Sequence, residues 1–201
     1  MKKKILVLAV LAICVAIAAT GTLAYFTATG TARNVITSGG INIAIEEKTQ
    51  SGGALVDFPA EGLTGIMPGT SASKIVKVKN TGSSEAWIRV KVESTITGAD
   101  GKPLPGTLNG GIPVMEFRIL SGWTEGADGY YYYEKPVAAG KATTELLKEV
   151  TFAPEMGNEY QGCKAQLLIS AEAVQTANNG TKVTEAKGWP AESDKKGGYT
   201  P

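Results

Sequence analysis

The sequence contains no histidine among its 201 residues. Imidazole is the usual general base of Ser-His and Cys-His catalysis, and it supplies the ligands of the H-E-x-x-H zinc site. The sequence also lacks a P-loop, a G-x-G-x-x-G stretch and an EF-hand loop. These absences exclude the common forms of several enzyme classes. We predict that the protein is not an enzyme, with no catalytic residue, no metal site and no cofactor.

Cysteine is nearly as scarce, since the chain has only Cys14 and Cys163. Cys14 lies in an apolar N-terminal run that we expect to be removed, so no intramolecular disulfide would remain and stability must come from a packed core. Cys163 precedes a predicted strand, where a thiol is usually a small buried apolar residue. An intermolecular disulfide through Cys163 is the alternative.

Long apolar runs are absent except at the N-terminus, where three lysines precede the uncharged run Ile5–Ala19. This run is short for a membrane-spanning helix, which needs about 20 residues. The small residues Thr22 and Ala24 then form an A-x-A-like site. We predict a secretory signal peptide over residues 1–24, cleaved to leave Tyr25 first. Cleavage after Ala28 and an uncleaved membrane anchor are the alternatives.

Charge of one sign is also lacking. Of 20 basic residues three lie in the signal, which leaves 17 basic against 19 acidic residues in the processed chain. Such a balanced chain offers no electrostatic attraction to nucleic acid or to an anionic membrane. We therefore expect no nucleic-acid partner, and membrane contact only during export.

What the sequence does contain is the period-two alternation of half-buried antiparallel strands. Apolar residues alternate with polar ones in four segments: Ile41–Ile45, Val76–Lys79, Ile88–Val92 and Ala165–Ala173. Further strands are expected at 54–58, 114–120, 130–134 and 146–152, with Trp123 and Tyr130–Tyr133 forming an aromatic hairpin. Residues 143–150 also fit a helix. Turn signals between the segments favour an all-β, antiparallel β-sandwich of jelly-roll type with about eight strands, preceded by the signal helix.

This pattern divides the chain into a signal peptide at 1–24, an N-terminal extension at 25–40, a sandwich domain at 41–176 and a loose polar tail at 177–201. Lysines on exposed strands discourage edge-to-edge pairing. We expect five basic residues to share one charged outer face: Lys74, Lys77, Lys79, Arg89 and Lys91.

Several blocks resemble a known family in their order along the chain. The aromatic pair Tyr25-Phe26 after the cleavage site is similar to proteins processed by the signal peptidase SipW. Asn34–Glu47, Met67–Glu93 and the block from Asn158 to Val174 resemble segments of the TasA and camelysin family. Residues 98–150 are not diagnostic.

The resemblance implies a secreted jelly-roll subunit of amyloid-like fibres in an extracellular biofilm matrix. It implies self-association into a homopolymer, processing by a SipW-type peptidase and an accessory matrix protein as a further partner. The resemblance to camelysin also implies a cell-surface metalloprotease as one alternative, although this chain has no histidine to serve as a metal ligand. A non-fibrous surface or spore-coat binding module is the other alternative.

The last expectation concerns the N-terminal extension. In TasA-type fibres this extension of one subunit completes the sheet of its neighbour, and here it carries Tyr25, Phe26, Val35 and Ile36. Burial of four such side chains contributes roughly 6–12 kcal/mol, which is comparable to the cost of ordering the segment. We predict that these residues form a donor segment between subunits. The alternative is that the segment is the first strand of its own sandwich.

Overall fold

The computed structural model describes residues 26–34, 40–60 and 63–190. It holds strands and two short 3-10 helices, and no α-helix within these ranges. The strands are β1 (Phe26–Asn34), β2 (Ile43–Ser51), β3 (Ala54–Asp57), β4 (Leu63–Ile66), β5 (Ser71–Asn80), β6 (Ala86–Thr97), β7 (Pro103–Leu104), β8 (Met115–Phe117), β9 (Trp123–Glu125), β10 (Tyr131–Tyr133), β11 (Leu147–Phe152) and β12 (Lys164–Gln175), and the 3-10 helices are η1 (Asn158–Tyr160) and η2 (Val183–Glu185).

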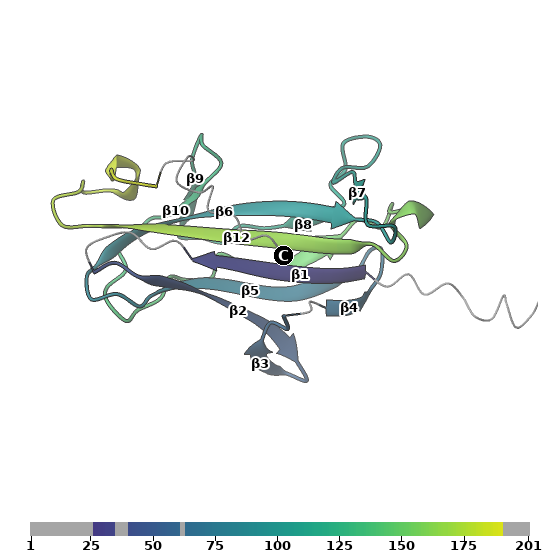
Figure 1. The fold of residues 1–201 in the computed structure, drawn as a ribbon, viewed down its shortest axis with the longest axis horizontal. Helices are drawn as coiled ribbons and strands as arrows, with labels where there is room; N and C mark the ends of the chain where they lie inside the picture. The colour runs from purple at the N-terminus through teal and green to yellow at the C-terminus, as the bar shows by residue number, and fades with distance from the viewer. Residues whose placement is uncertain (1–25, 35–39, 61–62, 191–201) are drawn as a thin grey trace, which may run out of the picture.

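The strands form two sheets that face each other (Figure 1). One sheet has the order β4-β1-β12-β6-β10-β9, with β7 paired to β6, and the other has the order β3-β2-β5-β11-β8. All strand pairs are antiparallel except β1 with β12. The prediction of an all-β two-sheet sandwich is confirmed. Twelve strands are described rather than about eight, because short strands such as β7 join the edges.

The core lies between the sheets and follows the alternation of the sequence. Ala165, Leu167, Ile169, Ala171 and Ala173 of β12 are all buried. They pack in one cluster with apolar residues of the other strands, including Ile43, Val76, Val78, Ile88, Val90, Leu147 and Phe152. This burial on one face explains why β12 pairs along its whole length with β6 in a fixed register, since a one-residue slip would turn every apolar side chain to the other face.

Other local predictions are also met. Residues 147–152 form a strand rather than a helix. The aromatic hairpin pairs Trp123 with Tyr133 across β9 and β10, and the two rings lie 5.0 Å apart between centroids. Cys163 is buried, and this burial raises the pKa of its thiol to about 11. A buried thiol of this kind is not available to a second chain.

Glycine at position 82 is required by a close approach of two chain segments. A Cβ at Gly82 would lie 2.3 Å from the carbonyl oxygen of Gly40. The Gly82 N–H donates to Asn42 O and to the side-chain oxygen of Asn80. Asn80 is fully buried and its amide donates to the carbonyls of Ser84 and Val137. The turn thus ties the entry to β2 to the connection between β5 and β6.

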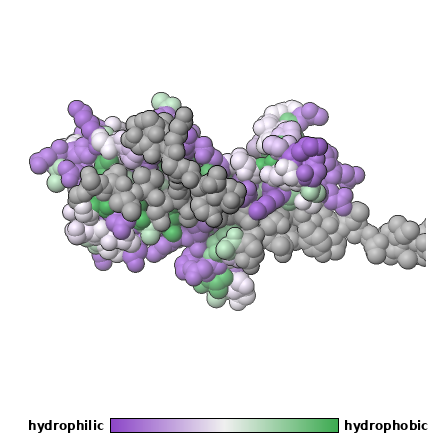
Figure 2. Space-filling view, in the orientation of Figure 1, coloured by the Kyte–Doolittle hydropathy of each residue, from purple (hydrophilic) through white to green (hydrophobic). Residues whose placement is uncertain are grey.

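The β2–β3 hairpin projects from the sandwich (Figure 1). Every residue of β3 is exposed, including Leu55 at 60% and Val56 at 41%. Figure 2 shows apolar surface on this projection. Since β3 is the last strand of its sheet, its outer edge is a place where another chain can pair.

The expectation that five basic residues share one charged outer face is wrong. Lys74 lies on the core side of β5 with Val76 and is only 3% exposed, and Arg89 is buried on the other sheet. The five basic residues therefore do not share one outer face. Lys74 stands two residues before Val76, so the same alternation that buries Val76 also buries Lys74.

The expectation of a loose tail does not hold for residues 177–190. This segment folds back over the outer face of β6 and β12, where it closes a second, smaller apolar cluster. The cluster consists of Trp87, Val174, Val183 and Ala186, with Tyr132 and Trp189 against it. Asn179 holds the segment in shape, because its side chain bonds to the backbone of Gln175 and Lys187. Sparse apolar residues at irregular spacing hid this packing from a periodicity argument.

Candidate functional site

The first candidate site is the place of strand β1 in the sandwich. Residues 27–34 of β1 pair in parallel with residues 164–171 of β12. On its other side β1 pairs with β4, with Phe26 opposite Ile66 and Ala28 opposite Leu63. In Figure 1 β1 lies between β12 and the second sheet, and it approaches β2. Strand β1 therefore covers the edge of β12 and closes the sandwich on that side.

The sequence of β1 gives it little apolar mass. Within the run FTATGTARN, Phe26 is the one large apolar residue. The paired segment of β12 has an apolar residue at every second position instead. Main-chain hydrogen bonds must therefore supply much of what holds β1, and parallel pairing is slightly less stable per residue than antiparallel pairing. Strands rich in small and polar residues also specify their register weakly.

Strand β4 depends on β1. Among the described strands β4 is paired only with β1, at the end of its sheet. If β1 left the sheet, the edge of β12 would be open over eight residues and β4 would have no partner. An open edge with free N–H and C=O groups binds an added strand by main-chain hydrogen bonds.

A buried ion pair lies on the strands that β1 and β4 approach. β1 contacts β2 of the other sheet, and β4 leads into β5 through the turn at residues 67–70. Glu47 of β2 and Lys74 of β5 face the core, with Lys74 Nζ 2.8 Å from Glu47 Oε1. Lys74 Nζ also lies 3.9 Å from the centroid of the Phe58 ring. The two side chains are 3% and 11% exposed, for Lys74 and Glu47 respectively.

The pair is incompletely satisfied. Lys74 Nζ and Glu47 Oε1 contact each other directly as an ion pair, and neither atom has a further hydrogen-bond partner among the described residues. Burial lowers the pKa of Lys74 although the Glu47 carboxylate opposes this. Removal of two charges from water costs several kcal/mol per ion, and an imperfect contact returns only part of it. The core beneath this side of the sandwich is thus weakened by its own charges.

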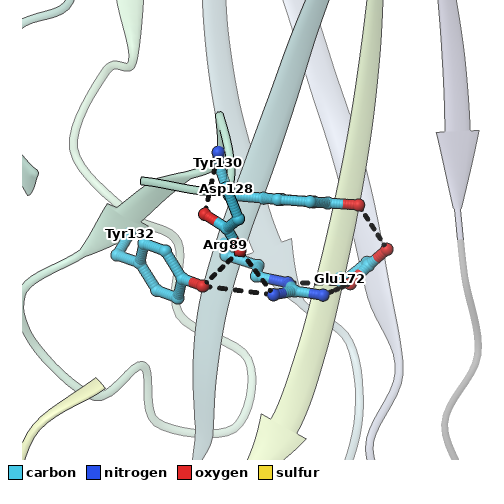
Figure 3. Close-up of polar contacts among 5 residues, drawn as sticks. All are labelled: Arg89, Asp128, Tyr130, Tyr132 and Glu172. Atoms are coloured by element: carbon cyan, nitrogen blue, oxygen red, sulfur yellow. Dashed lines mark hydrogen bonds and ion pairs between the residues drawn. The ribbon is translucent and has the colours of Figure 1, made fainter. Parts of the chain in front are cut away.

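The second candidate site is the network around Arg89 on the outer face of the first sheet (Figure 3). Arg89 Nε donates to Glu172 Oε2 at 2.8 Å, and Arg89 Nη2 lies 2.7 Å from the same oxygen. Arg89 Nη1 donates to Asp128 and to the Tyr132 hydroxyl, both at 3.1 Å. The Tyr130 hydroxyl donates to Glu172 Oε1 at 3.1 Å.

Two aromatic rings lie close to the guanidinium. Arg89 Cζ lies 3.9 Å from the Tyr130 ring centroid and 4.7 Å from that of Trp189. Such contacts add to the hydrogen bonds when the cation is desolvated. For Asp128 burial would raise the carboxyl pKa, but hydrogen bonds from Tyr132 and the Tyr130 N–H, with Arg89 nearby, hold it below its usual value.

This network joins four parts of the fold. Arg89 belongs to β6, Glu172 to β12, Tyr132 to β10 and Trp189 to the tail. Each charged group faces a partner of opposite charge, so the arrangement is suited to clamping strands together. Sequence analysis expected Arg89 on an exposed face and missed the clamp, because the tail that covers it shows no strand or helix periodicity.

Most of the predicted site residues lie outside the described residues. This applies to the cleavage residues Thr22, Ala24 and Tyr25, and to Val35 and Ile36 of the donor segment. Phe26 begins β1 and pairs through its backbone with Ile66. The described part of the donor segment is thus paired within its own chain, as the alternative prediction stated.

A metal-binding cluster and a membrane-spanning helix are both absent from the described residues. No group of three or more Cys, Asp or Glu side chains in this part of the chain is placed to hold a metal ion. In the same residues no helix has the length and apolar character to span a membrane.

Comparisons with known proteins add no relative. A scan against family models, a search of curated proteins and a search of solved structures each gave no significant match.

Proposed function

We propose that this chain is a secreted structural subunit of extracellular fibres, of the biofilm-matrix kind, that assembles by exchange of its N-terminal strand between subunits. In the fibre, β1 of one subunit occupies the place beside β12 of its neighbour. The sandwich is of the jelly-roll type found in the TasA and camelysin family, which the N-terminal blocks resemble. The protein is exported with its signal peptide and processed by a SipW-type peptidase.

The observation that carries the proposal is the way in which β1 is held. It pairs with β12 and β4 through the main chain, while its sequence offers one large apolar residue. The same pairing forms equally well with β12 of another copy, so exchange replaces each hydrogen bond by an identical one. When each subunit donates its strand to the next in a head-to-tail way, the assembly stays open and grows as a filament, whereas reciprocal exchange between two copies would close a dimer.

The weakened core beneath the strand supports the same conclusion. The ion pair of Glu47 and Lys74 lies on strands that β1 and β4 approach, and it lowers the cost of opening that side. On the other side of the first sheet, the buried charges of the Arg89 network are hydrogen-bonded to one another. The fold therefore combines a firm body with a separable strand.

The test is a reversible covalent lock. Thr29 of β1 pairs with Gln166 of β12, so Thr29→Cys with Gln166→Cys, in a Cys163→Ala background, links β1 to its own chain when oxidised. The oxidised mature protein should stay monomeric, and reduction should restore filaments in electron micrographs. A matched control links β6 to β12 through Glu93→Cys and Leu168→Cys, which also pair directly. This second lock should form filaments whether oxidised or reduced.

The outcomes separate the parts of the proposal. If the oxidised Thr29–Gln166 lock formed filaments like the reduced form, the fibre would not depend on exchange of β1. If the mature protein formed no filaments in either form or in the parent chain, the fibre function itself would be wrong. A non-fibrous surface module would then be the better explanation. The same filament assay applies to a mature chain that begins at Ile41, which should not assemble.

A further inference from the structure

The chain contains two Asn-Gly pairs in very different surroundings. Asn109-Gly110 lies in the exposed loop between β7 and β8, and Asn179-Gly180 lies in the folded tail. In an Asn-Gly pair the backbone nitrogen of glycine can attack the Asn side-chain carbonyl carbon, because glycine has no side chain to hinder the approach. Structure decides whether that approach is open.

At Asn109 the approach is open. Asn109 and Gly110 are both exposed, and a Cβ built on Gly110 would meet nothing within 4 Å. Leu108 and Gly111 close a turn around them through the Gly111 N–H, which donates to Leu108 O at 3.1 Å. In the described chain no hydrogen bond engages the Gly110 N–H or the Asn109 side chain. Gly110 has a φ of +84°, which places it among the conformations that glycine samples most freely.

At Asn179 the approach is closed. The side-chain nitrogen donates to the carbonyls of Gln175 and Lys187, both at 2.9 Å, and the side-chain oxygen accepts from Lys187 N at 2.8 Å. A Cβ at Gly180 would lie 3.0 Å from Glu185 Cβ and 3.3 Å from Lys182 O. All three hydrogen bonds must break before the carbonyl carbon can turn toward the glycine nitrogen.

We propose that Asn109 is a site of spontaneous deamidation in the folded protein and that Asn179 is protected from the same reaction. Hydroxide removes the Gly110 N–H proton, and the nitrogen forms a bond to Asn109 Cγ. The bond from Cγ to Nδ2 then breaks as water protonates Nδ2, so that ammonia leaves, hydroxide is returned and a cyclic imide is formed. Water then opens the imide at one carbonyl or the other and yields aspartate or isoaspartate.

The modification places a negative charge in a loop that otherwise has none between Lys102 and Glu116. The isoaspartate product also adds one backbone methylene at a turn whose ends are fixed by the bonds of Leu108 with Ile112 and Gly111. The loop precedes β8, the edge strand of the second sheet. The fraction of chains modified at this edge therefore increases with the age of the protein.

The test follows both sites in one sample. Mature protein is incubated at pH 8.5 and 37 °C and then digested with trypsin, which releases residues 92–118 and 165–182 as separate peptides with one Asn-Gly pair each. Mass spectrometry counts the gain of about 1 Da per event that replacement of NH2 by OH produces. In the native protein Asn109 should react at least about tenfold faster than Asn179, because local opening limits the protected site.

Two controls make the result decisive. In concentrated urea both sites should react at similar rates, since both are followed by glycine. The variant Asn109→Gln should abolish the mass gain in peptide 92–118 without changing peptide 165–182. Equal rates for the two sites in the native protein, or an Asn109 that stays unmodified there while it reacts in urea, would overturn the proposal.

Discussion

The two long sides of the sandwich are held by different means. On one side, β12 pairs with β6 over twelve residues, apolar side chains fill one face, and the other face is clamped by Arg89 and covered by the tail. On the opposite side of β12, β1 pairs over eight residues in parallel, with small and polar residues in its sequence. Strand β12 therefore has two unlike neighbours: β6 on the firm side, with many buried apolar side chains, and β1 on the weak side, with few large apolar residues in its sequence.

Charge placement sharpens this difference. Arg89 and Glu172 are buried and hydrogen-bonded to each other, and the rings of Tyr130 and Trp189 lie close to the guanidinium. Lys74 Nζ and Glu47 Oε1 are also buried, but they contact each other without a further hydrogen-bond partner among the described residues. A buried pair contributes to stability only when its geometry is good and its remaining polar atoms are satisfied. The same kind of contact therefore reinforces one side and weakens the other.

The largest expected effect concerns the firm side. Arg89→Ala leaves the Glu172 carboxylate buried without its cation, so the free energy of unfolding should fall by about 3–5 kcal/mol. Urea denaturation measures this change. Lys91→Ala is the matched control on the same strand, because Lys91 is a third exposed and pairs loosely with Glu93 at 3.5 Å. That control should cost less than about 1 kcal/mol. Similar losses of stability for both variants would show that the Arg89 network does not stabilise the β6–β12 side more than an exposed ion pair does.

The next effect concerns the ion pair on the weak side, where a single and a double substitution should change the free energy of unfolding in opposite directions. Lys74→Met alone leaves Glu47 buried and unpaired and should lower the free energy of unfolding by about 3–5 kcal/mol. The double variant Lys74→Met with Glu47→Leu fills the same space with apolar groups and should instead be neutral or raise it by about 1–4 kcal/mol.

Filament assembly gives this pair of variants a second readout. If the charges assist release of β1, the double variant should assemble more slowly than the parent chain, although it is more stable. A double variant that was strongly destabilised would show that the ion pair supports the core rather than weakens it.

The sequence predicted the firm side well. The alternation in β6 and β12 indicated their strand character and the residues that face the core, but it did not indicate that Arg89 and Glu172 on the outer face are buried as well. The same rule would have placed Lys74 inside, since it has the parity of Val76. We expected Lys74 on an outer face because it is charged, although its position in the alternation indicates the core side.

The tail and the strand pairing could not be predicted in this way. The contact of Trp189 with Arg89 joins residues 100 positions apart and leaves no periodic trace. The parallel pairing of β1 with β12 joins the two ends of the described chain, and neither alternation nor turn residues specify it. The strand pattern did separate residues 25–40 as an N-terminal extension, and the proposed function depends on that segment.

The smallest expected effect uses pH and concerns the residue next to the β1–β12 junction. Cys163 precedes Lys164, which pairs with Thr27 of β1. Burial raises the pKa of the Cys163 thiol from 9.0 to about 11. Between these values the unfolded chain releases the thiol proton while the folded chain keeps it, so the stability from this group is complete below pH 9 and is lost as the pH rises toward 11. Lys74 acts in the opposite direction, because burial lowers its pKa below 10.5 and its contribution grows with pH.

Unfolding midpoints at pH 8, 9, 10 and 11 should therefore fall less steeply in Cys163→Ala than in the parent chain, and more steeply in the Lys74→Met, Glu47→Leu variant. Parallel curves for Cys163→Ala and the parent would mean that the thiol reaches water in the folded protein, and thus that the β1 end of the sandwich is already open.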